Sequence, residues 1–355
     1  MRVRGCKDWD EGTRQMKTLR TAIIAAAIVA AASLARGGEL GHFNPGIPNV
    51  RDLVVPPPGW YVVLYNYGYT TDRLNDAGGN EVDSVTIRPG PGPGVTLDVD
   101  VDLDLYALSP MVIWVSPWRI GNARYAAYVA PGFVTSSLGA ALNATTGRGL
   151  SGEIDSSFGV GDLFVSPIWL GWPSKHWDFA LGYGFYAPTG RYEVETVTLP
   201  VVGPVKVEAE DNLGLGFWTH QIQGSAAWYP WEHRATAVVG AVTYEIHGNK
   251  EDFDINPGSH LTLNLGASQY LPLTKDQKLL AEVGLTGYSQ WKITGDTGAD
   301  TRNGSVLDRV HAVGAQMGVV WVPWNLSVNL RYDVEYASEA RFQGEVLSLA
   351  VVFKL

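Results

Sequence analysis

The chain has almost no cysteine and no long hydrophobic run. Cys6 is the only cysteine among 355 residues, and it precedes the segment that we interpret below as an export signal. The exported protein would therefore contain no cysteine, which excludes disulfides and cysteine-based catalysis or metal binding. The longest apolar run, Thr21–Leu34, is shorter than the roughly 18 residues that a membrane-spanning helix needs. A protein of helical membrane spans is excluded, although hydrophobic residues make up 46% of the sequence.

Positive charge is also scarce. The chain has 26 Lys and Arg against 36 Asp and Glu, a net charge of −10. Without residues 1–35 the balance is 20 against 33, or −13. Binding to nucleic acid depends on Lys and Arg side chains that neutralise phosphates, so this balance argues against nucleic acid as a partner. It does not argue against lipid, because a membrane β-barrel keeps its charges in its loops and lumen.

Residues 1–35 have the features of a secretory signal peptide. Lys17 and Arg20 precede the apolar run, and the small-x-small pattern Ser33-Leu34-Ala35 ends it. A basic region, a short apolar region and small residues are typical of a cleaved signal rather than of a membrane anchor or a buried helix. Met16 stands where such a signal would begin, and residues 1–15 would then be an upstream extension.

Five short segments combine proline with bulky apolar side chains. Their prolines are 56, 57, 42 and 51 residues apart, and longer loops rich in Gly, Asp and Asn lie between them. Tight turns on one side, long loops on the other and aromatic girdles are typical of a transmembrane β-barrel. The five segments are Trp114–Trp118, Trp169–Trp177, Trp228–Trp231, Tyr270–Leu273 and Trp321–Trp324.

Alternation of apolar and polar residues predicts the strands and their faces. In Asn325–Tyr336 every second residue is apolar or aromatic and the others are polar or charged. Successive side chains of a strand point to opposite faces, so one face suits lipid and the other a polar lumen. A soluble sandwich has the same period, but the length and the flanking aromatics favour a membrane strand. The predicted outward faces are Leu326, Leu330 and Val334; Leu349, Val351 and Phe353; and Leu261, Leu263 and Leu265.

The predicted fold class is therefore all-β: a transmembrane antiparallel β-barrel of about twelve strands over residues 59–355. Both termini would be periplasmic, on the short-turn side. In lipid every backbone polar group must be paired, which requires closure, and twelve strands should leave a narrow pore or a small cavity. Pro110, Pro131 and Pro167 fall inside predicted strands, where we expect bulges or bends. The predicted strands are 59–72, 96–117, 123–137, 157–172, 176–188, 212–229, 235–248, 259–271, 278–293, 309–322, 325–337 and 343–355.

Polar side chains on the predicted lumen face mark a candidate substrate path. Within Leu97–Tyr106, four aspartates follow one another at every second residue. Such carboxylates repel one another and need water, a cation or a facing Arg or Lys. Three interpretations stay open for this acidic stripe: a solvated strand end above the membrane, a lining of the lumen, or a specific Ca²⁺ site. The residues assigned to the lumen are Asp100, Asp102, Asp104, Tyr106, Glu282, Tyr288, Arg331, Asp333 and Glu335, with Arg331 expected to pair with Glu282 or Asp333.

Residues 36–58 form an arm before the first strand. Its proline and glycine exclude a helix and a central strand. Two interpretations remain, a periplasmic tail or a plug folded into the lumen. In the plug, His42, Phe43 and Pro45 would lie inside, with Phe43 packed against an inward residue such as Tyr288 or Tyr106. The arm would enter from the periplasmic side.

Enzyme signatures are missing. Neither Gly-x-Ser-x-Gly nor His-Glu-x-x-His occurs. A triad could be assembled on paper from His220 and Ser225, or from His247 or His260 with Glu245, but only geometry would support it. We therefore expect no catalytic residue, no metal and no cofactor. An outer-membrane lipid hydrolase remains one alternative, and a structural or adhesive surface barrel another.

Several short motifs together resemble one protein family. They are Gly41–Gly46, Pro56–Tyr61, Ala187–Tyr192, Asn212–Thr219, Gly287–Gln290, Thr294–Gly298 and Ala340–Glu345. In this order they resemble the MetA-pathway of phenol degradation family of outer-membrane proteins, over about residues 39–355. The resemblance implies a barrel in the Gram-negative outer membrane, surrounded by its lipid, for passive uptake of small hydrophobic or aromatic molecules. It implies no catalytic residues. The barrel assembly machinery would insert the chain, although it ends in Leu355 rather than the usual Phe or Trp.

Overall fold

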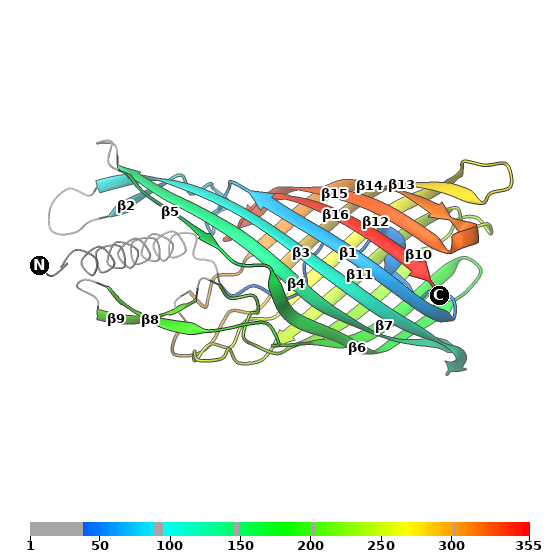
Figure 1. The fold of residues 1–355 in the computed structure, drawn as a ribbon, viewed down its shortest axis with the longest axis horizontal. Helices are drawn as coiled ribbons and strands as arrows, with labels where there is room; N and C mark the ends of the chain where they lie inside the picture. The colour runs from blue at the N-terminus through cyan, green and yellow to red at the C-terminus, as the bar shows by residue number, and fades with distance from the viewer. Residues whose placement is uncertain (1–37, 88–94, 145–148, 200–202, 210, 302) are drawn as a thin grey trace, which may run out of the picture.

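Twelve long strands close into an antiparallel barrel (Figure 1). The computed structural model describes residues 38–87, 95–144, 149–199, 203–209, 211–301 and 303–355. Closure comes from β16 pairing with β1 and from β3 pairing with β4. The predicted all-β barrel and its strand number are confirmed. In order around the ring the strands are β1 (Gly59–Thr71), β3 (Val95–Ile120), β4 (Ala123–Ala144), β6 (Gly159–Pro173), β7 (Trp177–Ala187), β10 (Thr219–Trp228), β11 (Thr236–His247), β12 (His260–Pro272), β13 (Leu279–Lys292), β14 (Arg309–Trp321), β15 (Leu326–Glu339) and β16 (Glu345–Lys354).

The predicted long loops contain further strands. β2 (Ser84–Ile87) and β5 (Gly149–Asp155) extend the sheet beside β3 and β4, and β8 (Val194–Leu199) with β9 (Gly203–Glu208) forms a separate hairpin. β10 starts seven residues later than predicted. The preceding backbone is bonded to loop and lumen groups instead, since Leu213 N–H donates to Arg191 O and Leu215 N–H to Asp162.

The three prolines inside strands lie where the ladder is irregular. β3 and β4 lose their pairing between Leu108 and Val112, around Pro110. The β4–β6 register shifts just after Pro131, and the β6–β7 register shifts around Pro167. Because proline has no N–H to donate, these bends are the expected solution inside a closed sheet.

The outer surface is apolar, as the alternation predicts. On β15, Val328, Leu330 and Val334 are exposed, whereas the intervening Asn329, Arg331, Asp333 and Glu335 are buried inside the barrel. Leu349 and Phe353 are exposed on β16, and Leu265 on β12. At the short-turn end a girdle of exposed tryptophans surrounds the barrel: Trp60, Trp118, Trp177, Trp228, Trp231, Trp321 and Trp324.

The arm runs through the barrel from one end to the other. At the long-loop end, Glu39 N–H donates to Asp296, while at the short-turn end Pro57 O accepts from Tyr61 OH. Gly59 and Leu355 both lie at the short-turn end, where Leu355 N–H donates to Trp60 O. The described chain nevertheless begins at the opposite mouth. The prediction that the arm enters from the short-turn side is wrong, because the partners of Glu39 lie in the long loops.

A short 3-10 helix, η1 (Val50–Leu53), fixes the half of the arm nearer the short-turn end. The prediction that the arm contains no helix is wrong here, because Val50–Leu53 lie between the prolines at 48 and 56 and contain neither proline nor glycine. Val50 and Leu53 pack against small inward side chains of β10 and β11, among them Ala227, Ala237 and Ala241. These small residues leave the space that the helix occupies.

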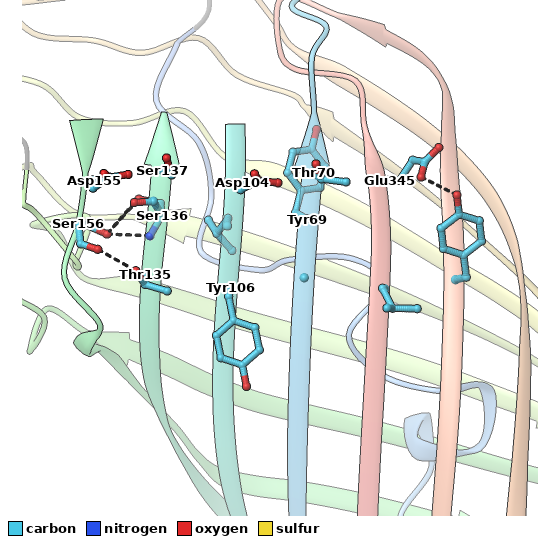
Figure 2. A pocket seen from close by; sticks show the side chains of 14 residues that line it. Tyr69, Thr70, Asp104, Tyr106, Thr135, Ser136, Ser137, Asp155, Ser156 and Glu345 are labelled. Carbon is cyan, nitrogen blue, oxygen red and sulfur yellow. Dashed lines mark hydrogen bonds between the residues drawn. The ribbon is translucent and has the colours of Figure 1, made fainter. Parts of the chain in front are cut away.

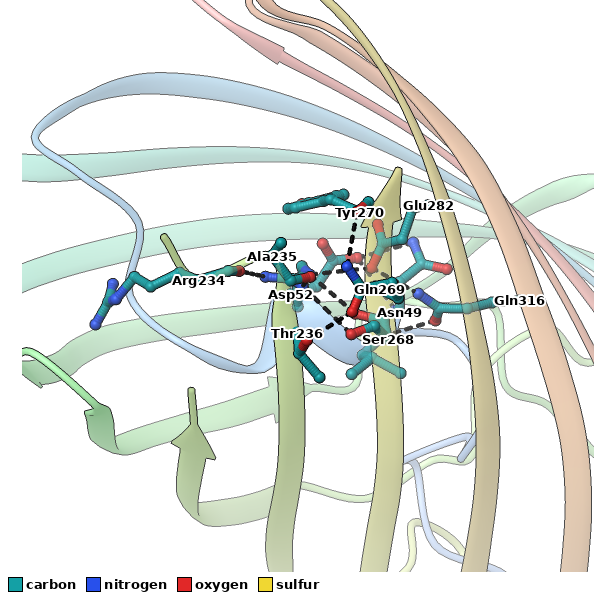
Figure 3. A network of polar contacts seen from close by, with 12 residues as sticks. Asn49, Asp52, Arg234, Ala235, Thr236, Ser268, Gln269, Tyr270, Glu282 and Gln316 are labelled. Carbon is teal, nitrogen blue, oxygen red and sulfur yellow. Dashed lines mark hydrogen bonds and ion pairs between the residues drawn. The ribbon is translucent and has the colours of Figure 1, made fainter. Parts of the chain in front are cut away.

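Arg51 of η1 neutralises a buried acid on the barrel wall. Its Nε lies 3.2 Å from Glu282 Oε1 and 2.9 Å from Ser268 Oγ. Figure 3 shows Glu282 and Ser268 in the polar network at this place. Its guanidinium also stacks on the Tyr270 ring, 3.9 Å from the centroid, and donates to Ala235 O. The Glu282 side chain is only 2% exposed, so it depends on this partner.

Substitutions to arginine can test which face of β15 points toward lipid and which toward the lumen. Leu330→Arg places a charge on the lipid side, which costs about 2–4 kcal/mol near the bilayer midplane. Asn329→Arg places it in the polar lumen. We expect Leu330→Arg to reduce the fraction of folded barrel more than Asn329→Arg, as read from heat-modifiable migration in gels. Equal effects would show that the facing is wrong.

The Arg51–Glu282 ion pair can be tested by a double-mutant cycle. Arg51→Ala leaves the Glu282 charge buried, a change that costs up to about 3–5 kcal/mol. We expect faster hydrogen exchange at the amides of Val50–Leu53, with partial recovery when Glu282→Gln is added. Arg191→Ala, which breaks an exposed pair with Asp211, is the matched control and should leave these amides unchanged. Exchange that is the same in all variants would contradict this role of Arg51.

Candidate functional site

The lumen has a polar side and an apolar side. The arm is bonded mainly to the wall formed by β11 to β16, through Glu245, Gln290, Gln316, Arg331 and Ser348. Opposite this wall, a cavity of about 460 Å³ lies between the arm and β1, β3, β4 and β6. Its lining is mostly aliphatic and aromatic, and includes Tyr61, Met111, Ile113, Tyr128, Phe164 and Trp169.

The cavity has the character of a small-molecule site. Such sites are concave and mainly apolar, with a few polar groups that orient the ligand. Gln221 lines this cavity, is 4% exposed, and its Oε1 has no hydrogen-bond partner among the described residues. A buried acceptor without a partner costs free energy, so a ligand hydroxyl that donates to it would be favoured. The site can therefore hold an apolar ring and one donor group.

Five of the residues that we assigned to a substrate path do face the lumen, but they hold the arm and one another. Arg331 Nε lies 2.5 Å from Asp333 Oδ2, and its Nη1 donates to Pro48 O of the arm at 2.6 Å. Tyr288 OH donates to Glu335 Oε1 at 2.8 Å. Arg331 thus pairs with Asp333, whereas Glu282 takes Arg51 as its partner. These buried charges lie on the polar side, away from the apolar cavity.

The acidic stripe faces outward, so its assignment to the lumen is wrong. Asp104 pairs with Thr70 and Tyr106 with Gly68, on the outer face of β1, while Leu105 and Ala107 point inward. Alternation shows which side chains share a face, but only the register with β1 decides which face that is. The same register places Asp100 and Asp102 outside. All four aspartates of the stripe, Asp98, Asp100, Asp102 and Asp104, are exposed.

Figure 2 shows Asp104 and Tyr106 in an outer hollow, with Asp155, Glu345 and Thr70 nearby. The hollow has a volume of about 680 Å³ and lies on the long-loop half of the barrel. Glu345 already accepts a hydrogen bond from Tyr332 OH at 2.6 Å. The position agrees with the interpretation of the stripe as a solvated strand end.

The three residues assigned to the plug lie in the lumen. His42 and Pro45 are buried, and Phe43 is half-buried. The His42 ring stacks on Tyr186 with centroids 4.7 Å apart, and its Nε2 lies 2.9 Å from Asp162. Phe43 does not pack as we predicted: Tyr106 faces outward, and Tyr288 packs with Ile47 instead.

Charged groups also hold the arm at the long-loop mouth. Lys250 Nζ lies 2.5 Å from Glu39 Oε2 and also contacts Glu208 of β9. Burial alone would lower the pKa of Lys250, but the charges of Glu39 and Glu208 outweigh it and hold that pKa above its usual value. Lys250 therefore stays charged, and it ties the start of the arm to two loops.

The structure separates the residues of the first candidate triad and brings together those of the second. His220 points outward and bonds to Tyr183 OH, whereas Ser225 points inward and donates to Leu53 O. By contrast, Glu245, His247 and His260 meet inside the barrel. The sequence offered these three residues as possible members of a triad, but their spacing gave no sign that they touch.

Comparisons with known proteins agree with this architecture. The model of the MetA-pathway of phenol degradation family matches residues 71–351. No curated protein matches the chain. Among the described residues, no helix is long and apolar enough to cross a membrane.

Among solved structures, one with a TM-score above 0.5 shares the fold at low identity, and two more distant ones are given beside it. The COG4313 outer membrane channel from Pseudomonas putida F1 is 15% identical, with a TM-score of 0.54 over 88% of this chain and 100% of that one. The β domain of the Bordetella autotransporter BrkA is 8% identical, with a TM-score of 0.46 over 84% and 100%. A Pseudomonas aeruginosa FadL homologue is 11% identical, with a TM-score of 0.37 over 91% and 98%.

The family match covers most of the barrel, which is a closed twelve-stranded sheet with an apolar outer face. The chain therefore belongs to the MetA-pathway of phenol degradation family and is a β-barrel of the Gram-negative outer membrane.

Proposed function

We propose that this barrel admits small hydrophobic or aromatic compounds passively, and that the arm narrows its lumen. The observation that carries the proposal is the aromatic and aliphatic cavity of about 460 Å³ beside the arm. A general porin would have a wide aqueous lumen lined by polar groups. Here the polar side chains are used to hold the arm, and the remaining space is apolar.

The extent of the cavity supports a route along the barrel. Its lining includes Leu40 and Leu213 toward the long-loop mouth and Pro56 and Val352 toward the short-turn end. An apolar molecule that follows this lining stays in contact with apolar surface, which stabilises it relative to water. Gln221 would favour ligands that also carry a hydroxyl, such as a phenol.

We further propose that the barrel is neither an enzyme nor a purely structural or adhesive barrel. His220 and Ser225 lie on opposite faces of β10, which argues against the hydrolase triad considered above. A structural barrel needs no space inside, and would gain stability by filling its lumen. The cavity supports a passage instead.

Deletion of the arm should open the lumen. Without residues 38–54, the polar wall would face water, and the constriction would be lost. We expect the single-channel conductance in planar bilayers to rise several-fold. Heat-modifiable migration should still show a folded barrel, because the arm contributes no strand to the sheet. Unchanged conductance of the folded deletion variant would contradict the role of the arm.

Filling the cavity should reduce uptake. Ala130→Trp places an indole in the apolar space, since Ala130 lines the cavity and is 5% exposed. Ala127→Trp, on the outer face of the same strand, is the matched control. We expect cells that produce Ala130→Trp to take up a labelled monoaromatic compound about tenfold more slowly than cells that produce Ala127→Trp. Equal rates at equal amounts of folded barrel would show that molecules do not pass through this cavity.

A further inference from the structure

A cluster of three metal-binding side chains is buried in the polar wall of the lumen. Glu245 and His247 come from β11, and His260 comes from the start of β12, directly opposite Glu245 in the ladder. They are 1%, 5% and 0% exposed. One donor atom from each lies within 4.8 Å of the other two, and His247 Nε2 is 3.0 Å from His260 Nδ1.

Of the two carboxylate oxygens of Glu245, one accepts a hydrogen bond and the other is left without a donor among the described residues. Glu245 Oε1 accepts the Phe43 N–H of the arm at 2.9 Å, but Oε2 has no hydrogen-bond partner within the part of the chain that the structure describes. A buried carboxylate oxygen without a donor is costly, and natural structures pair such atoms or bind them to metals. Oε2 is therefore a free ligand atom beside two imidazoles.

A chain of hydrogen bonds continues from the cluster across the lumen. His247 Nδ1 lies 2.7 Å from Thr219 Oγ1, which lies 2.7 Å from His42 Nδ1. His42 Nε2 lies 2.9 Å from Asp162 Oδ2. Since a carboxylate only accepts, His42 must carry its proton on Nε2. Thr219 then donates to His42 Nδ1 and accepts from His247 Nδ1–H.

If no metal ion is bound, this direction of donation leaves two hydrogen-bond acceptors facing each other. His247 Nε2 becomes an acceptor, so a neutral His260 would have to donate from Nδ1. His260 Nε2 would then be bare, facing Asp308 Oδ2 at 3.8 Å. Both of these atoms are buried, and neither has a hydrogen-bond partner among the residues that the structure describes. Two acceptors would face each other in the interior.

We propose that a divalent transition-metal ion binds here through His247 Nε2, His260 Nδ1 and Glu245 Oε2. The ion takes the lone pairs of both imidazoles, so His260 carries its proton on Nε2 and directs it at Asp308. Glu245 Oε2 gains its missing partner. Thr219 and Asp308 then orient the two histidine ligands in the way that outer partners of metal sites do. Two imidazoles and a carboxylate suit Zn²⁺ and its neighbours.

The space for the ion is kept free by a glycine. A Cβ on Gly41 of the arm would lie 2.6 Å from Glu245 Oε2 and 3.2 Å from His260 Nδ1. A tetrahedral ion with bonds of about 2.0–2.1 Å needs donors about 3.3 Å apart, close to the separation of the two imidazole nitrogens. Lys292, which lies opposite His260 in the ladder, is engaged elsewhere, since its Nζ lies 2.5 Å from Asp296 Oδ1.

Zinc titration of the full-length barrel tests the site. The protein in detergent is stripped with a chelator and titrated with Zn²⁺ against a chromogenic competitor, and Co²⁺ reports the geometry by its visible spectrum. We expect one Zn²⁺ per barrel and a tetrahedral Co²⁺ band. Thr219→Val should weaken binding about 10- to 100-fold, and His260→Gln or Glu245→Gln by at least as much. Gly41→Ala keeps all three ligand residues, but its methyl group would occupy the space of the ion, so we expect it to abolish Zn²⁺ binding.

The control is His220→Gln, a change on the outer face of β10 that should leave Zn²⁺ affinity unchanged. Folding of each variant is checked by heat-modifiable migration. Zn²⁺ that binds equally to the wild type, His260→Gln and Gly41→Ala would come from other surface groups and overturn the proposal. Absence of stoichiometric binding would also overturn it.

Discussion

Every backbone N–H and C=O that crosses a membrane must find a partner within the protein, and the rest of this structure depends on that constraint. In the barrel it is met by closure, with β16 paired to β1 from Tyr61↔Lys354 to Thr70↔Glu345. Closing twelve strands leaves an interior wider than its own side chains can fill. The arm, a segment of the same chain, fills part of this interior space.

The arm lies along one side of the lumen because charged side chains line that part of the inner wall and mostly apolar side chains line the other. Between β11 and β15 the inward positions include Glu245, Glu282, Arg331, Asp333 and Glu335, all buried. Buried charges need partners, and the arm supplies Arg51, the N–H of Phe43 and the carbonyl of Pro48. On β1, β3 and β4 the inward side chains are mostly aliphatic and aromatic. They offer the arm fewer bonds, such as those from Tyr61 OH to Pro57 O and from Tyr65 OH to Asp52, so apolar space remains there.

Near the long-loop mouth, the arm contacts a cluster of buried histidines and a buried glutamate. His42, Thr219, His247 and His260 form a continuous chain of contacts from Asp162 to the wall at Asp308. Gly41 and Phe43 lie directly against Glu245. A metal ion in this cluster would join side chains of β11 and β12 directly beside the arm.

Much of this fold could be predicted from the sequence, since a strand in lipid has a strict period of two and is bounded by aromatic and proline-rich turns. The twelve-stranded closure, the lipid face of β15 and the positions of most strands follow from local pattern, whereas the start of β10 and the end of β4 do not. Period two fixes which side chains share a face but not which face that is. The register of β3 against β1 therefore decided that Asp98–Asp104 point outward. Likewise, the direction of the arm and the meeting of Glu245, His247 and His260 arise from contacts between distant residues, which no local pattern contains.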